Sequence, residues 1–226
     1  VQVKACGICG SDLHAYRIGL FEDALGRPIE NGLIMGHEWG GEVVEVGQGV
    51  ERFQVGDRIT GGGLGGFAEY LPIEVNEKRP YSLPEPISFE EGAMMEPLAT
   101  SVHTVGQAQP TEGETVVILG VGIIGLGCIQ VIRTTLDCRI IAIDASAKRL
   151  GMAQQLGADE TVNLTETDPV EAVIEHTGGA RPVENFGARG GNADLVIDCA
   201  GATASPNQGL TMLKQQNGRL IFVALF

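Results

Sequence analysis

The sequence predicts an α/β protein in which a doubly wound parallel sheet follows a smaller, β-rich domain. Short strand-like runs separated by glycine turns occupy residues 1–79. After Gly113, strand-like and helix-like segments alternate, which is the pattern of a parallel sheet covered by helices. A Gly-x-Gly-x-x-Gly sequence from Gly120 to Gly125 joins the first of these strands to the first of these helices. We therefore expect a β-rich domain over residues 1–105 and a dinucleotide-binding domain over residues 106–226.

In the β-rich domain, apolar and β-branched runs predict strands at residues 1–3, 41–46, 58–60 and 67–73. Ser88 and Glu91 have the spacing of a capping box, so we expect a helix to begin there. Pro97 disfavours helical geometry at Glu96 and suits the first turn of a new helix. We expect a break between two helical segments at Glu96.

In the second domain, the alternation predicts a strand at 115–119, a helix at about 123–135 and a strand at 139–143. Ser146 can cap the next helix and Gly157 can end it. Further strands are expected near 161–164, 195–198 and 220–223. Residues 178–192 contain many glycines and charges without periodicity, and this predicts a surface loop.

Composition excludes several classes of protein. The 226 residues carry a net charge of -14 with only 15 lysines and arginines, so nucleic acid and anionic membrane surfaces are poor partners. The longest apolar run, 115–126, is interrupted by glycines and is too short to span a bilayer. Five cysteines, an odd number, argue against a disulfide framework and favour a soluble protein of the reducing cytoplasm. Residues 1–5 and 220–223 both read as strands at the ends of the sequence, so we expect the natural chain to be longer.

The glycine-rich turn is a candidate dinucleotide site. Gly120, Gly122 and Gly125 follow an apolar strand and open an apolar helix, where backbone amides can hold a pyrophosphate. Asp144 closes the second strand and can accept hydrogen bonds from the ribose hydroxyls, which favours NAD. Lys148 and Arg149 leave NADP open. Alternatively, the glycines only permit close packing and Asp144 is an ordinary residue at the end of a strand.

Cys6 and Cys9 form a Cys-x-x-Cys pair with three interpretations: a redox dithiol, half of a structural zinc site, or one metal ligand beside a bystander. A redox dithiol belongs at the start of a helix in an α/β unit, and this pair lies in a β-rich region. A structural site needs a second close pair, whereas the other three cysteines are isolated from one another. We favour Cys9 as a ligand and Cys6 as a packing residue.

Four motifs follow one another along the sequence: Cys9-Gly10-Ser11-Asp12-x-His14, Gly36-His37-Glu38, Gly56-Asp57-Arg58 and Glu96-Pro97-Leu98-Ala99. Together they resemble those of the zinc-dependent medium-chain alcohol dehydrogenase family, most closely its polyol, sorbitol and threonine dehydrogenase branches. The resemblance implies a GroES-like catalytic domain, a Rossmann domain, one catalytic Zn²⁺, and hydride transfer from a secondary alcohol or polyol to NAD. It also implies a homodimer or homotetramer. A zinc-free quinone or enone reductase of the same superfamily, and a non-catalytic nucleotide- or metal-binding homologue, are the alternatives.

The same resemblance implies residue roles. Cys9 and His37 become zinc ligands, with Glu38 or Glu96 completing the set, and Asp12 orients the ligand histidine. Ser11 receives the substrate proton and His14 passes it outward. The implied cofactor contacts are Thr100, Gly120, Gly122, Ile123, Ile124, Gly125, Asp144, Arg149 and Val223.

The sequence departs from the family in one place. Members with a structural zinc carry a lobe with four cysteines between the Gly56-Asp57-Arg58 motif and the Gly66-Phe67-Ala68-Glu69-Tyr70 motif. Here only nine residues, 59–67, cover that distance. Either this protein lacks the lobe or the segment is missing from the sequence.

Overall fold

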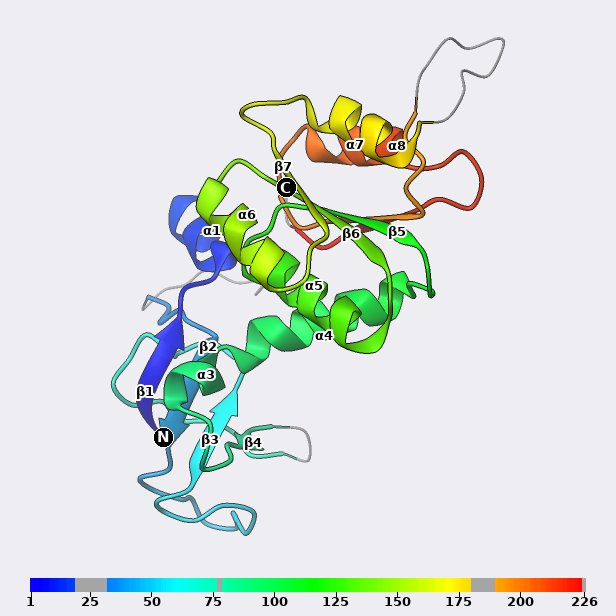
Figure 1. The fold of residues 1–226 in the computed structure, drawn as a ribbon. Helices are drawn as coiled ribbons and strands as arrows, with labels where there is room; N and C mark the ends of the chain where they lie inside the picture. The colour runs from blue at the N-terminus through cyan, green and yellow to red at the C-terminus, as the bar shows by residue number, and fades with distance from the viewer. Residues whose placement is uncertain (19–31, 77–78, 180–189, 225–226) are drawn as a thin grey trace. The chain divides into compact units, whose positions relative to one another are not determined.

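A computed structural model describes residues 1–18, 32–76, 79–179 and 190–224 (Figure 1). The chain divides into two compact units, Val1–Pro97 and Leu98–Phe226. Over the described ranges the first unit contains a four-stranded antiparallel sheet and the second a five-stranded parallel sheet. No helix in these ranges has both the length and the apolar character needed to cross a membrane.

The sheet of the first unit has the strand order β1-β2-β3-β4. Its strands are β1 (Gln2–Gly7), β2 (Glu38–Glu42), β3 (Arg58–Gly61) and β4 (Tyr81–Ser82). Helix α1 (Gly10–Ile18) follows β1, and the short helix α3 (Phe89–Ala93) packs on β1 and β2. The core of this unit is formed by Trp39, Val43, Phe53, Ile59 and Leu71.

The strand predicted at 41–46 lies earlier, at Glu38–Glu42, because two glycines allow close backbone approach there. A Cβ on Gly40 would lie 2.5 Å from the carbonyl oxygen of Phe89, and one on Gly41 would lie 2.5 Å from that of Gln2. Beyond β2, Val44 and Val46 are exposed, whereas Val43 is buried in the core of this unit. Their β-propensity was therefore a misleading signal, since packing decides where a strand forms.

The strand predicted at 67–73 is also wrong. This segment runs beside the start of β1, with the amide of Leu71 donating to the carbonyl of Val1 at 2.8 Å and that of Val3 donating to Glu69 at 3.0 Å. Only one isolated bridge, between Gln2 and Tyr70, joins the two segments. The sequence reasoning did not anticipate α1 or the two-residue strand β4, because neither carries a strong periodic signal.

The predicted capping box is confirmed at the start of α3. The Glu91 amide donates to the Ser88 hydroxyl at 3.1 Å, and the Ser88 amide donates to the Glu91 carboxylate at 2.7 Å. The break between helices falls at Met94, however, and helix α4 (Met95–Ala108) already includes Glu96. Pro97 occupies the first turn of α4, where its missing N–H has no helical partner to lose, so the break at Glu96 was misplaced by two residues.

The parallel sheet of the second unit has the order β7-β6-β5-β8-β9, and the doubly wound prediction is confirmed. Helices α5 and α6 cover one face and α7 and α8 the other (Figure 1). Alternate residues of β5 enter two separate apolar clusters, with Val116 and Ile118 on one face and Val117 and Leu119 on the other. The elements are β5 (Thr115–Leu119), α5 (Ile123–Thr135), β6 (Arg139–Asp144), α6 (Ala147–Gln155), β7 (Glu160–Asn163), α7 (Pro169–Thr177), β8 (Leu195–Asp198), α8 (Ser205–Met212) and β9 (Arg219–Phe222).

Most boundaries in this unit agree with the predicted ones to within one or two residues. Ser146 caps α6 by accepting the amide hydrogen of Arg149 at 3.4 Å, and α6 ends before Gly157. In the predicted loop at 178–192, residues 180–189 lie outside the described residues. The strand order reverses between β5 and β8, and the carboxyl ends of strands at such a point are where open α/β sheets bind ligands.

Candidate functional site

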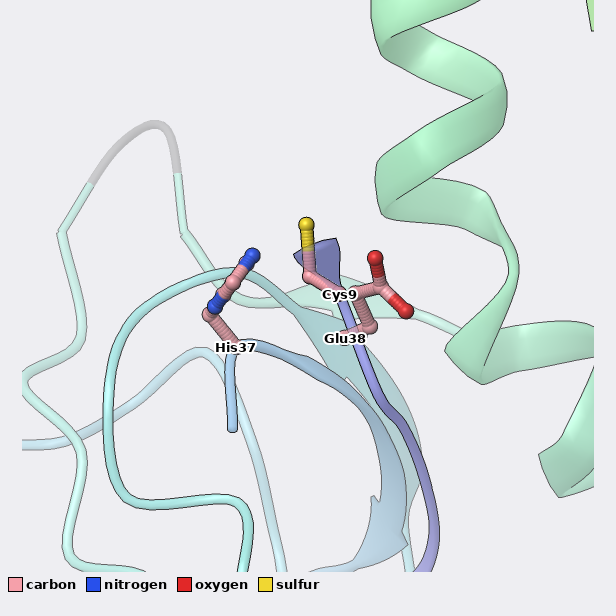
Figure 2. Close-up of side chains that lie close together, drawn as sticks. All are labelled: Cys9, His37 and Glu38. Carbon is pink, nitrogen blue, oxygen red and sulfur yellow. The ribbon is translucent and has the colours of Figure 1, made fainter. Parts of the chain in front are cut away.

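Three side chains of the first unit form a group with the chemistry of a metal centre (Figure 2). Cys9 lies between β1 and α1, His37 directly precedes β2, and Glu38 is the first residue of β2. One ligand atom from each lies within 4.8 Å of the other two. Pairing of β1 with β2 places Gly7 opposite Glu38, which brings the Cys9 loop beside the His37–Glu38 segment.

The donor set suits zinc. A thiolate sulfur, an imidazole nitrogen and a carboxylate oxygen are all common zinc ligands, and three protein ligands are typical of catalytic zinc sites. A tetrahedral ion at bond lengths of about 2.0–2.3 Å separates its ligand atoms by about 3.3–3.7 Å, so small side-chain rotations would close this group around the ion. Among the described residues this is the one such group of three or more.

Asp12 joins the two chain segments that carry these donors. Its carboxylate is 3 % exposed and accepts the amide hydrogen of Cys9 at 2.9 Å and that of Gly36 at 3.2 Å. One carboxylate oxygen lies 3.6 Å from Nδ1 of His37. Asp12 lies in the first turn of α1, where the helix dipole favours a negative charge. In metal sites, a carboxylate placed beside a histidine in this way fixes the orientation of the ring.

A short glycine-rich segment supports the His37 side of the group. The Gly66 amide donates to the Gly36 carbonyl at 2.8 Å, and the Phe67 amide donates to Met35 at 2.9 Å. Gly36 has φ +83°, and a Cβ there would lie 2.5 Å from the Phe67 ring. The nine-residue connection over 59–67 therefore helps to hold the backbone leading to His37.

Burial raises the pKa of the Glu38 carboxyl, because its side chain is only 8 % exposed; the nearby His37 lowers that pKa and the negative charges of Glu96 and Asp12 raise it. A carboxylate held in such surroundings gains from a neighbouring cation. Glu96 is near enough to interact through its charge but is not part of the group of three. The structure thus brings Glu38, and not Glu96, to Cys9 and His37.

Cys6 lies outside the group. Its side chain packs against the core that contains Trp39, and its sulfur lies 2.7 Å from the position that a Cβ on Gly66 would take. Burial raises the pKa of the Cys6 thiol, and a protonated thiol is a poor metal ligand. These contacts are those of a packing residue.

Ser11 and His14 are three residues apart on α1 and are both half-buried, so they lie on one side of that helix. Neither side chain forms a hydrogen bond or ion pair with any other described residue.

The glycine loop of the second unit has the three distinct features of a dinucleotide cradle. Gly120 has φ +80°, and a Cβ there would lie 2.6 Å from Cα of Ala200. A Cβ on Gly125 would lie 2.1 Å from the Gly120 carbonyl oxygen, so this glycine is required for packing of helix against strand. A Cβ on Gly122 would meet nothing within 4 Å, so open space lies above that backbone. Tight turn, open approach and close packing are the three glycine roles in such loops.

The amino end of α5 adds free donors to this loop. Gly122 is the N-cap and provides no side-chain cap, and no acidic residue lies in the first turn. The amides of Ile123, Ile124 and Gly125 therefore have no partner within the helix, and together with the helix dipole they suit a pyrophosphate. The loop fits NAD or NADP.

Asp144 lies at the end of β6 beside this loop and is 7 % exposed. Its carboxylate accepts the amide hydrogens of Val121 at 3.0 Å and of Ser146 at 2.8 Å, and the Arg149 guanidinium lies 3.7 Å away. Asp144 thus supports the loop itself, and a carboxylate retains further lone pairs for ribose hydroxyls.

The remaining predicted cofactor residues lie elsewhere in the unit. Thr100 is on α4, and its carbonyl accepts the Thr104 hydroxyl at 2.8 Å. Val223 directly follows β9 and donates its amide hydrogen to the Asp198 carbonyl at 3.0 Å.

Sequence reasoning missed Asp198 at the end of β8. Its fully buried carboxylate accepts the Ser205 hydroxyl at 2.6 Å and the Ala200 amide hydrogen at 3.0 Å. It holds Ala200 where that residue packs on Gly120. The signal was an acid closing an apolar strand, the same signal that identified Asp144.

Comparisons with known proteins agree with both units. Residues 1–84 match the alcohol dehydrogenase GroES-like domain, and residues 124–226 match the zinc-binding dehydrogenase domain. The (R,R)-butanediol dehydrogenase of Bacillus subtilis is 37 % identical over 79 % of this chain and 60 % of its own length. The sorbitol dehydrogenase of Halalkalibacterium halodurans is 31 % identical over 100 % of this chain and 68 % of its own length.

Among solved structures, a protein of Sinorhizobium meliloti 1021 described as a zinc-binding dehydrogenase, bound to NADP, has a TM-score of 0.81 at 31 % identity. It is matched over 100 % of this chain and 69 % of its own. The chain thus spans about 60–69 % of the length of these relatives. On these matches, the chain belongs to the zinc-dependent medium-chain alcohol and polyol dehydrogenase family.

Proposed function

We propose that the protein is a zinc-dependent oxidoreductase that transfers a hydride from a secondary alcohol or polyol to NAD. The group formed by Cys9, His37 and Glu38, tied together by the buried Asp12, carries this proposal. The open cradle at Gly122 in the same chain supplies the second requirement, a site for the hydride acceptor. The names of the relatives from Bacillus subtilis and Halalkalibacterium halodurans support a diol or sugar alcohol as the substrate class.

In this proposal Cys9, His37 and Glu38 hold the zinc ion. When bound, zinc increases the acidity of an alcohol hydroxyl and so favours the alkoxide from which hydride leaves. The Ser11 hydroxyl oxygen accepts the alcohol proton while releasing its own, and a ring nitrogen of His14 carries the proton onward. The shared side of α1 and the absence of other described partners support this pair of roles. Asp12 holds the His37 ring and the Cys9 backbone in place.

Asp144 supports NAD over NADP, because a carboxylate beside the ribose repels a 2′-phosphate. Arg149 is the competing feature, since its guanidinium lies 3.7 Å from Asp144 and its side chain is 57 % exposed. The Sinorhizobium meliloti relative holds NADP, so both dinucleotides belong in the test.

The decisive experiment combines metal analysis with turnover of the full-length protein. We expect about one zinc per chain, and oxidation of polyols, threonine or simple secondary alcohols with NAD. Cys9→Ser should lose zinc and turnover but keep dinucleotide binding, since the glycine loop belongs to the other unit. Cys138→Ser, a buried thiol of the second unit, is the matched control and should keep all three.

Two outcomes would contradict the proposal. Turnover by protein with less than about half an equivalent of zinc would indicate a zinc-free reductase of the same superfamily. Stoichiometric zinc and dinucleotide binding without turnover on any member of the panel would indicate a non-catalytic homologue.

A further inference from the structure

Gly7, the last residue of β1, lies directly opposite Glu38 in the antiparallel pairing of β1 with β2. A Cβ on Gly7 would lie 2.1 Å from a carboxylate oxygen of Glu38, 3.1 Å from its Cβ and 3.2 Å from its carboxyl carbon. Contacts under 3.0 Å essentially never occur for a real Cβ. The carboxyl end of Glu38 therefore occupies the space that any side chain at position 7 would fill.

We infer that Gly7 is a positioning residue that makes Glu38, and not Glu96, the carboxylate of the metal centre. This inference rests on the proposed zinc site. Only with an unsubstituted Cα at position 7 can the Glu38 carboxylate lie across the end of β1, where it meets Cys9 and His37. Glu96 comes from the first turn of α4 and lies outside the group of three.

The predicted clash is local. The nearest atom is the far end of the Glu38 side chain, which can rotate, and no backbone atom of another strand is among the three nearest atoms. Gly7→Ala should therefore leave the sheet in place and move the carboxylate away from the other two donors. Gly10, three residues further along the chain, offers a matched control, because a Cβ there would meet nothing within 4 Å.

A double-mutant cycle of Gly7→Ala and Glu38→Ala tests the inference. Zinc affinity of the metal-free full-length protein would be measured by competition with a chromogenic chelator, and unfolding would be followed by the fluorescence of Trp39, the single tryptophan. We expect Gly7→Ala to weaken zinc binding about 10–100-fold, as loss of a supporting contact does in metal sites. The double variant should bind zinc no more weakly than Glu38→Ala alone, because the carboxylate is already absent. Any stability lost in Gly7→Ala should return in the double variant, which removes the clash.

The fold losses in zinc affinity caused by Gly7→Ala and by Glu96→Gln should instead multiply when the two substitutions are combined. The control variant Gly10→Ala should bind zinc with the affinity of the parent protein. The inference would be overturned, with the metal centre left intact, if Gly7→Ala bound zinc as tightly as the parent protein. It would also be overturned if the fold losses in zinc affinity of Gly7→Ala and Glu38→Ala multiplied in the double variant. Unchanged zinc affinity in both Glu38→Ala and Cys9→Ser would overturn the metal centre and this inference with it.

Discussion

Replacing Asp12 by alanine should destabilise the first unit and weaken its metal site together. The carboxylate accepts two backbone amides, and the two losses differ in size. The bond from Gly36 is buried, so its amide would lose its acceptor at a cost of about 1–3 kcal/mol. The bond from Cys9 is only partly buried, and water can replace part of it, so about 0.5–1.5 kcal/mol is expected there. The free energy of unfolding should fall by about 1.5–4.5 kcal/mol, and zinc affinity should fall about 10–100-fold.

Urea unfolding followed by Trp39 fluorescence reports on this unit, since Trp39 is 1 % exposed in its core. Asp57→Ala is the control, because Asp57 accepts one amide, that of Gln54, at an exposed position. The free energy of unfolding of Asp57→Ala should fall by only about 0.5–1 kcal/mol, and its zinc affinity should not change. Asp12→Asn keeps one acceptor oxygen, so its losses of stability and zinc affinity should lie between those of Asp12→Ala and Asp57→Ala. If Asp12→Ala matched Asp57→Ala in both stability and zinc affinity, the reasoning that Asp12 ties the two donor segments would be refuted.

Three further predictions concern the second unit. Gly122→Ala should leave the melting temperature unchanged but weaken NAD binding about tenfold. Gly125→Ala should instead destabilise the unit by about 1–3 kcal/mol, because its Cβ would meet the Gly120 carbonyl. Calorimetry measures both the stability and the NAD affinity, and equal effects of the two variants would contradict the assigned glycine roles. Asp144→Ala should bring the affinities for NAD and NADP closer together in binding titrations, and an unchanged ratio would mean that Asp144 supports only the loop. Burial raises the pKa of Asp194, but hydrogen bonds from Lys214 and Thr115 outweigh it and hold that pKa below its ordinary value of 3.8. The contribution of Asp194 to stability is therefore present above that value and lost as pH falls through the folded-state pKa. Asp194→Asn should flatten the acid limb of a profile of stability against pH below that ordinary value, and a profile parallel to that of the parent protein would contradict this.

In the second unit the strands and the helices α5 and α6 could be predicted from sequence to within one or two residues, although α7 and α8 were not anticipated. In the first unit two of the expected strands were displaced or wrong. The central strands of the parallel sheet are buried on both faces and read as apolar runs, as β5 does from Thr115 to Leu119. Glycine and serine then mark the helix ends. In the first unit the strand β2 reads Glu-Trp-Gly-Gly-Glu, a sequence of low β-propensity, and it forms because its glycines admit α3 and β1. The β-propensity of a segment therefore says little about whether it forms a strand when close backbone contacts determine where the strand lies.

The candidate site divides in the same way. Cys9, His37 and Glu38 could be named from sequence because donor atoms belong to residue types, and the choice between Glu38 and Glu96 could not be made. That choice depends on distance, which the pairing of Gly7 with Glu38 sets. Asp12 was expected to orient the ligand histidine, and its two backbone hydrogen bonds show an additional role in holding the loops together.

Empty space, as much as donor chemistry, defines both candidate sites. At Gly7 the space that a Cβ would take is occupied by the Glu38 carboxylate, and at Gly125 it is occupied by the Gly120 carbonyl. At Gly122 the corresponding space contains no protein atom within 4 Å. The first two glycines therefore serve contacts already present in the folded chain, and substitution there disturbs the protein itself. Gly122 serves a contact that the protein does not make alone, so a substitution there should change neither fold nor stability and should show its effect only when a dinucleotide is added. A glycine whose Cβ would meet nothing, beside helix amides without a side-chain cap, is thus a physical indication of a ligand that the sequence motif by itself does not provide.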